Sequence, residues 1–68
     1  MNEPKYKIGN IVILNSGGPN MTINTVNENL EENKYVFNGT YECLWFDNFT
    51  IKKETFYEQT ISKVEHNT

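Results

Sequence analysis

The chain has 68 residues, of which 37% are hydrophobic and 13% aromatic, and its formal net charge is −3 with six lysines and no arginine. A chain of this length forms one domain with a thin core, because folding buries only about 60% of the surface that the unfolded chain exposes. Arginine is the side chain best suited to bidentate phosphate and base contacts, so its absence and the acidic balance argue against a nucleic-acid binder.

The cysteine content and the two ends of the chain suggest a compartment and a domain layout. Cys43 is the only cysteine, which excludes an internal disulfide, and no Cys/His cluster has zinc spacing. No signal-peptide pattern begins the chain and no apolar run approaches the ~18 residues of a membrane span, so we expect a cytoplasmic protein. Polar composition predicts flexible tails around one domain, with the tails at residues 1–4 and 66–68 and the domain at residues 5–65.

The first strand is expected at residues 11–14, a short β-branched run bounded by turn residues. Gly9 and Asn10 predict a turn just before it. Either alternate pair of side chains can face the core, and we assign Val12 and Leu14 to it. The same parity brings Ile8 to the core face.

A tight connection follows the first strand. Paired glycines reach positive φ without strain, and proline fixes φ at about −65° and lacks an N–H donor, so neither a strand nor a helix should cross this stretch. The turn residues are Ser16, Gly17, Gly18 and Pro19. Two glycines can also form an anion-binding nest, but the Lys-Ser/Thr pair and helix of a phosphate loop do not follow, which favours the structural turn.

The second strand is expected at residues 21–26, where alternation places Met21 and Ile23 toward the core. Val26 has the opposite parity, which predicts a bulge or a strong bend near residues 24–25.

A hairpin is expected around Asn38 and Gly39, the preferred pair for a two-residue type I′ turn, between β-rich runs at residues 34–37 and 40–46. The polar and acidic residues 27–33 before it predict an exposed loop or one helical turn. In the second run Tyr41, Cys43 and Trp45 share one face, while Leu44 and Phe46 share the other. A strand that is apolar on both faces is either central in a curled sheet or covered on its outer face by a partner.

The C-terminal part predicts a turn at residues 47–48 and then a strand at residues 49–56, whose charged middle would protect a sheet edge. Residues 57–60 suit a single 3₁₀ turn, and residues 61–64 a last short strand. The fold class predicted from these elements is all-β, a small SH3-like barrel of five or six short antiparallel strands with one 3₁₀ turn before the last strand.

Three stretches carry a resemblance to a known family. Residues 7–23 read Lys-Ile-Gly-Asn-Ile-Val-Ile-Leu-Asn-Ser-Gly-Gly-Pro-Asn-Met-Thr-Ile, residues 43–47 read Cys-Leu-Trp-Phe-Asp, and residues 54–56 read Glu-Thr-Phe. This pattern resembles the YodC-like family of small uncharacterised bacterial proteins, which implies a small β-barrel from a bacterium or its phage without an established activity. The sequence departs from the family pattern at Asn10, where the family prefers aspartate, and in a longer acidic segment before Tyr41.

Catalytic chemistry finds little support in the residues. His66 is the only histidine and lies in the expected tail, and Cys43 lies in an apolar strand where a buried thiol is inert. The carboxylates lack the pocket and the second partner that would separate their pKa values. We therefore expect no enzyme, with no catalytic residues, no metal site and no cofactor.

The aromatic content points instead to a binding surface. Aromatic residues concentrate at protein interfaces and in the peptide-binding clefts of SH3-like barrels. The candidate partner-binding residues are Leu44, Phe46 and Phe49, with Lys52 and Lys53 as a polar rim. We expect a protein-interaction module that binds a protein partner or a second copy of itself and no membrane; the alternative is a nucleic-acid-binding barrel that uses a face of lysine and aromatic residues.

Overall fold

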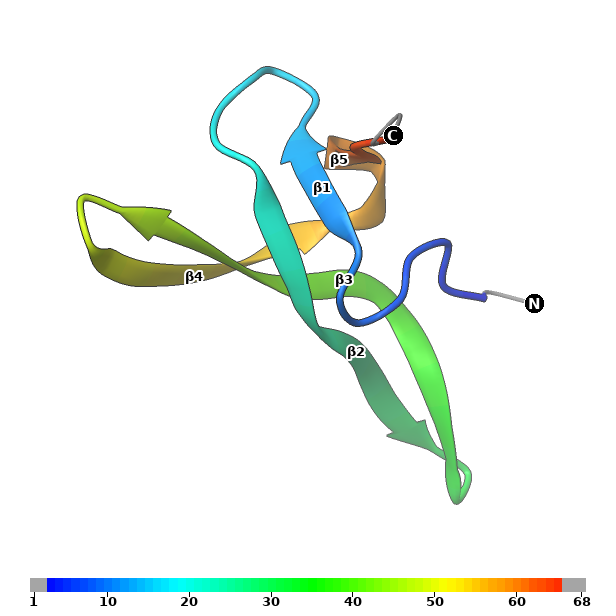
Figure 1. The fold of residues 1–68 in the computed structure, drawn as a ribbon. Helices are drawn as coiled ribbons and strands as arrows, with labels where there is room; N and C mark the ends of the chain where they lie inside the picture. Colours follow the sequence, from blue (N-terminus) through cyan, green and yellow to red (C-terminus); the bar gives the residue numbers. More distant parts are fainter. Residues whose placement is uncertain (1–2, 66–68) are drawn as a thin grey trace.

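One antiparallel sheet of five strands makes up the computed structural model, which describes residues 3–65 (Figure 1). Its elements in chain order are β1 (Ile11–Leu14), β2 (Met21–Glu31), β3 (Lys34–Asp47), β4 (Thr50–Tyr57), the 3₁₀ helix η1 (Glu58–Thr60) and β5 (Ile61–Lys63). The strand order is β4-β3-β2-β1-β5. The all-β prediction and the 3₁₀ turn before the last strand are therefore confirmed.

Closure of the sheet into a barrel is not confirmed. The strand pairs found within residues 3–65 leave β4 and β5 as the two ends of the sheet. Of the two expected tails, residues 1–2 and all of 66–68, including His66, lie outside the described residues.

The first strand, β1, agrees with its prediction in bounds and in the side chain at its centre. Val12 is fully buried, and Leu14 is half-buried against the core. The prediction for Ile8 is wrong, since its side chain is 67% exposed. A turn with Gly9 at φ 95° separates Ile8 from β1, so the alternation of the strand does not extend back to it. The Asn10 side chain supports this turn by accepting a hydrogen bond from the backbone N–H of Lys7 at 3.0 Å.

The connection from β1 to β2 has the backbone that its glycines predict. Gly17 and Gly18 adopt φ values of 107° and 131°, a region that strains any residue with a Cβ. The Gly17 N–H donates a hydrogen bond of 2.9 Å to the Leu14 carbonyl. The stretch from Ser16 to Pro19 therefore acts as a structural turn.

Strand β2 is longer than predicted. Its register with β3 shifts between Ile23 and Thr25, which confirms the expected bulge, and shifts again between Val26 and Glu28. The prediction of a loop or helical turn at residues 27–33 is wrong, because β2 stays paired with β3 as far as Glu31. Polar side chains suit this stretch as well as a loop, because residues 28–33 of the two-stranded ribbon are exposed to solvent.

The hairpin predicted at Asn38 and Gly39 is also wrong, because both residues lie inside β3. Phe37 pairs with Glu28 and Tyr41 with Val26, so residues 38–40 of β3 oppose a single residue of β2. Gly39 has a φ of 88°, which a bulge can require just as a type I′ turn does. The Asn-Gly pair thus bends a continuous strand instead of reversing the chain.

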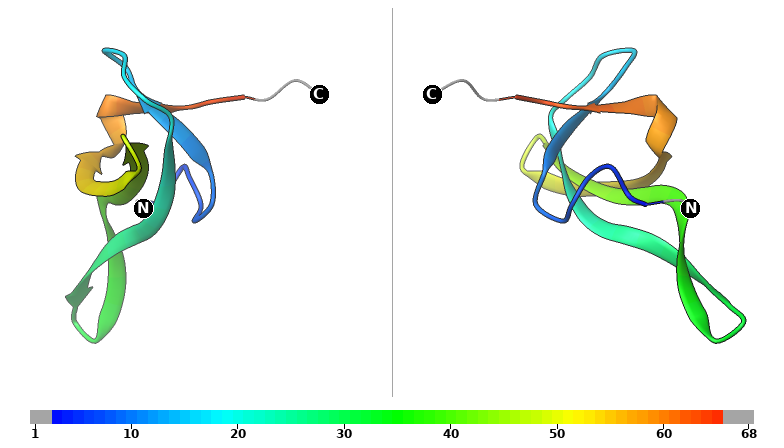
Figure 2. Two further views of the ribbon diagram at one scale, coloured as in Figure 1. Left: turned by 60° about the vertical axis from the view of Figure 1, so that its left-hand side comes forward. Right: turned by 90° about the vertical axis from the view of Figure 1, so that its right-hand side faces the viewer.

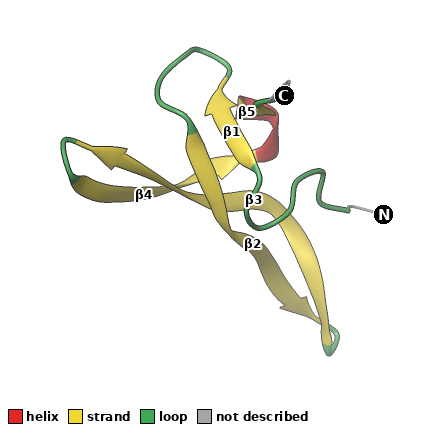
Figure 3. Cartoon of the chain, in the orientation of Figure 1, coloured by secondary structure: helices red, strands yellow, loops and turns green. Residues whose placement is uncertain are grey.

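Two tight turns join the long strands (Figure 3). Glu32 and Asn33, with φ values of 48° and 65°, connect β2 to β3. Asn48 and Phe49, with φ values of 55° and 68°, connect β3 to β4, so the turn lies one residue later than predicted. The last strand ends at Lys63, one residue earlier than expected.

The core lies on one face of the curved sheet (Figure 1), and Tyr6 of the N-terminal segment contributes to it. Met21, Ile23, Tyr41 and Cys43 are buried as their parities predict, and Trp45 and Phe56 pack against them from the side. Within residues 3–65, the buried apolar residues are Tyr6, Val12, Met21, Ile23, Phe37, Tyr41, Cys43 and Ile61.

Beyond the second register shift, the hairpin of β2 and β3 leaves the sheet as a two-stranded arm, residues 28–37. In both views of Figure 2 this green end projects away from the other strands. The arm accounts for the long shape of the molecule, which measures 42 × 27 × 22 Å. The hairpin of β3 and β4 points in another direction (Figure 1), so the two hairpin tips are separate features.

Candidate protein-binding face

Strand register brings together the side chains on the solvent face of the sheet. Leu44 of β3 lies between Thr22 of β2 and Lys53 of β4, and Phe46 lies directly opposite Ile51. Directly opposed residues of antiparallel strands project to the same face. These five side chains therefore share the face opposite the core, which we call the outer face.

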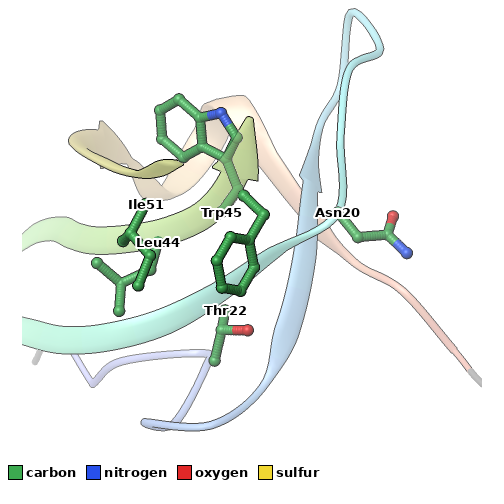
Figure 4. A pocket seen from close by; sticks show the side chains of 6 residues that line it. Asn20, Thr22, Leu44, Trp45 and Ile51 are labelled. Atoms are coloured by element: carbon green, nitrogen blue, oxygen red, sulfur yellow. The ribbon is translucent and has the colours of Figure 1, made fainter. Parts of the chain in front are cut away.

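A shallow cavity of about 300 Å³ opens on the outer face. Figure 4 shows Leu44 and Ile51 lying together beside it, while the Trp45 indole points to the side away from Thr22. The cavity is lined by Asn20, Thr22, Leu44, Trp45, Phe46 and Ile51. Its walls are therefore mainly apolar, with one amide and one hydroxyl at the edge formed by β2.

Two apolar side chains of this face are largely open to solvent, while Leu44 between them and β2 is half-buried. Phe46 is 70% exposed and Ile51 61% exposed, whereas Trp45 is half-buried with its ring centroid 6.3 Å from that of Phe56. Single exposed apolar residues are ordinary, but a contiguous exposed group marks an interaction surface. The prediction that Leu44 and Phe46 face away from the core is confirmed.

Phe49 stands at the tip of the β3–β4 hairpin and is 97% exposed. Its φ of 68° lies in the left-handed region, where a bulky side chain costs on the order of 1–3 kcal/mol. Asn48 suits its own positive φ, but glycine is the residue that this type of turn favours at the position of Phe49. The chain thus keeps an aromatic side chain at a position where both the backbone and the hydrophobic effect disfavour it.

The two candidate lysines of β4 do not lie together. Lys52 pairs with Trp45 and Lys53 pairs with Leu44, so alternation directs them to opposite faces of the strand. Only Lys53 borders the outer face. The predicted rim of both side chains is therefore wrong. Neighbouring residues in a strand alternate between its two faces, so the sequence itself argues against such a rim.

Sequence reasoning missed Asn20, Thr22 and Ile51, and it placed Trp45 with the core face and not at the cavity. Asn20 and Thr22 belong to another strand or its lead-in, and only the register of β2 against β3 shows that they adjoin Leu44. Ile51 could have been found from the turn, because a two-residue loop at Asn48 and Phe49 fixes its pairing with Phe46.

The only thiol lies on the core face and away from this surface. Cys43 is fully buried, and burial together with the nearby Glu42 carboxylate raises the pKa of its thiol to about 11. Because the thiolate is the reactive form, Cys43 is inert in the folded protein.

A hydrogen-bonded cluster on the other side fixes the start of the domain. The Tyr41 hydroxyl donates to the Glu58 carboxylate at 2.6 Å and accepts the backbone N–H of Tyr6 at 3.2 Å. The same carboxylate oxygen accepts the backbone N–H of Lys5 at 2.9 Å, and the Tyr6 hydroxyl donates to the Ile61 carbonyl at 3.2 Å. This cluster joins the N-terminal segment to β3, η1 and β5, and its groups are occupied with one another.

The cluster has clear electrostatic consequences. Burial, together with the hydrogen bond to Glu58, raises the pKa of Tyr41 to about 12. Burial opposes ionisation of Glu58, but the hydrogen bonds from Tyr41 and from the Lys5 backbone outweigh it and lower the pKa of this carboxyl. Both pKa shifts favour a neutral tyrosine and a charged carboxylate, the protonation states that the hydrogen bond from Tyr41 to Glu58 requires.

Two further searches cover residues 3–65. No helix in that range is long and apolar enough to cross a membrane. The same range holds no group of three or more His, Cys, Asp or Glu side chains placed to bind a metal ion.

Comparison with known proteins identifies a family. The chain matches the family described as "Uncharacterized small protein (DUF2158)" over residues 7–61. No curated protein and no solved structure matches the chain. The matched region begins just before the turn at Gly9 and ends at the first residue of β5, so it includes every residue that lines the outer-face cavity. The chain belongs to the DUF2158 family of uncharacterized small proteins.

Proposed function

We propose that this protein is a non-enzymatic protein-interaction module that binds its partner on the outer face. The observation that carries the proposal is the exposed apolar cavity between Leu44, Phe46 and Ile51, on the side of the sheet away from the core. Burying such a surface is favourable by roughly 25 cal/mol per Å² of apolar area. An apolar surface left in water contributes nothing to the stability of a small domain, so its presence is best explained by a partner that covers it.

The charges around the cavity support a protein partner over a nucleic acid. Lys53 is the one lysine of β4 on the outer face, and Lys52 lies on the other side of the strand. Single-stranded nucleic acids bind in continuous basic grooves that track the phosphates. An isolated lysine beside an apolar cavity in an acidic chain without arginine favours a peptide or protein surface.

Three finer assignments belong to the same proposal. The position of η1 directly before β5, and the pairing of β1 with both β2 and β5, support an SH3-like arrangement, whose grooves bind extended peptides. The DUF2158 match supports the YodC-like resemblance and, with it, a bacterial or phage source. A cytoplasmic location is the third assignment, and it is supported by a sequence whose single cysteine builds no internal disulfide framework.

A photo-crosslinking experiment tests the proposal. A benzophenone-bearing phenylalanine replaces Phe46, and the same group at Ile8 provides the matched control, since the two side chains are 70% and 67% exposed. In extracts of the source cells we expect protein adducts from position 46, including adducts between copies, that are absent from position 8. Adducts of equal yield at both positions would contradict a specific outer face.

A salt series separates the nucleic-acid alternative. Retention on nucleic acid that weakens steeply with salt, by about 0.9 in log-log slope per phosphate contact, would favour the alternative. In that case Lys52→Glu with Lys53→Glu should abolish retention, while Phe46→Ala should leave most of it. The proposed function expects binding of the protein partner to be lost in Phe46→Ala and kept in the variant with Lys52→Glu and Lys53→Glu.

A further inference from the structure

We propose that the outer-face cavity is filled by Phe49 of a second copy of this chain, in a reciprocal dimer. This inference rests on the proposed function and names its partner. The chain carries both halves of such a contact, namely an exposed aromatic side chain and an apolar cavity that no side chain of the described residues fills.

The size and chemistry of the two halves match. The cavity holds about 300 Å³, and an apolar cavity of about 150 Å³ already admits a benzene ring. The walls formed by Leu44, Phe46 and Ile51 offer apolar and aromatic contacts to an inserted phenyl ring. The cavity is therefore large enough for the phenyl ring of Phe49 and for part of the backbone that carries it.

The position of Phe49 explains why it would persist in an unfavourable turn. Its backbone adopts a φ of 68°, and 97% of its side chain is in water. Strained positions that survive within a well-formed scaffold are candidates for function. The turn holds the aromatic ring out from the hairpin, as insertion into another molecule requires.

The arrangement suits a two-fold axis. Phe49 follows Phe46 by three residues and precedes Ile51 by two, so the inserted group and the cavity lie at the same end of the β3–β4 hairpin. An axis beside this tip brings each Phe49 toward the cavity of the other copy. Such an interface is self-complementary and closes at two subunits, the commonest form of homo-oligomer.

The area that the contact buries is consistent with the dimer. A large aromatic side chain buries about 150–250 Å² when it is covered. Phe46, Phe49 and Ile51 with their polar surroundings then supply roughly 500 Å² per copy, which reaches the ~1,000 Å² total at which specific interfaces begin. We therefore expect a weak but specific dimer.

Sedimentation velocity of the full chain, from low micromolar to millimolar concentration, tests the inference. We expect a monomer–dimer equilibrium that Phe49→Ala weakens about thirtyfold or more, the fold-change of an interface hot spot. Tyr35→Ala is the matched control, because Tyr35 is an aromatic side chain that is 72% exposed on the arm, and it should leave the equilibrium unchanged. Circular dichroism confirms that both variants fold.

Isotope-filtered NOE spectra of a mixed labelled and unlabelled sample locate the contact. Contacts from the Phe49 ring of one copy to the Leu44 and Ile51 methyl groups of the other would support the inference. A monomer at millimolar concentration, a dimer insensitive to Phe49→Ala, or a dimer without these contacts would overturn it. If the chain is monomeric while the probe at position 46 captures another protein, this inference fails and the proposed function stands.

Discussion

The Tyr41 hydroxyl donates a 2.6 Å hydrogen bond to the carboxylate of Glu58, and this contact joins the centre of β3 to η1. The pKa of Tyr41 is raised from 10.0 to about 12, first by burial and then by this bond. A group whose pKa rises on folding contributes stability that is complete below its unfolded pKa and is lost as the pH rises through the folded value.

Tyr41→Phe should therefore remove an alkaline transition. Wild-type protein should lose stability between about pH 10 and pH 12, and the variant should lose less over that window. At neutral pH we expect a loss of about 1–2 kcal/mol, because the Glu58 carboxylate and the Tyr6 N–H lose a partner. Urea unfolding across the pH range measures both effects, with the exposed Tyr35→Phe as the control.

Glu58→Gln should be destabilising at neutral pH and nearly neutral in acid. The folded-state pKa of Glu58 lies below its ordinary 4.5, so the carboxylate contributes stability above that value that is lost as the pH falls through the folded value. Glu58 is partly exposed to solvent, so we expect only about 1 kcal/mol. Thermal unfolding from pH 7 to pH 3 checks it, and an equal loss at all pH values would contradict the electrostatic explanation. Glu54→Gln on β4 is the matched control.

Gly39→Ala should destabilise the protein by about 1–2 kcal/mol, the cost of a Cβ at positive φ. Gly39 adopts a φ of 88°, and a Cβ built there meets no described atom within 4 Å, so the cost is conformational and not steric. A chemically synthesised chain with D-alanine at this position should keep wild-type stability. If both alanines were equally harmful, the bulge would not be the reason for glycine.

Phe49→Gly should raise the stability of the monomer by about 1 kcal/mol, because glycine adopts the φ of 68° without strain. The measurement is urea unfolding at low protein concentration, where self-association does not contribute. The same variant should fail to dimerise. A gain of stability with a loss of association would show that the aromatic residue is kept for binding.

Cys43 should resist alkylation until the protein unfolds. Its thiol is buried and has a pKa of about 11, so both access and thiolate content are low at neutral pH. Maleimide labelling followed by mass spectrometry should be slow in buffer and fast in denaturant. Rapid labelling of native protein would show that β3 opens locally.

The elements that the sequence predicts well are those specified by neighbouring residues. β1 and η1 follow from short local signals, and the bulge near residues 24–25 follows from the wrong parity of Val26. The Asn38–Gly39 signal failed because a type I′ turn and a strand bulge both require positive φ. Only the pairing of β2 along the whole of β3 decides between the two.

The candidate site was predictable to the extent that one strand contains it. Leu44 and Phe46 follow from alternation within β3, and Phe49 from its place beside a turn. Thr22 joins them through a register that a bulge shifts, which the residues alone do not specify. A surface that crosses three strands can be derived only once their alignment is known.

The bulge at residues 38–40 has a consequence for how this chain can vary. Asn27 donates a 2.9 Å hydrogen bond to the Thr40 hydroxyl, which in turn donates one of 2.6 Å to Asn38, so the base of the arm is tied together by its own side chains. Beyond these hydrogen bonds, β2 and β3 pair only with each other. Pairs of residues can therefore be inserted or removed around Glu32 and Asn33 without moving a core side chain, which makes this hairpin end a natural graft point for foreign peptides.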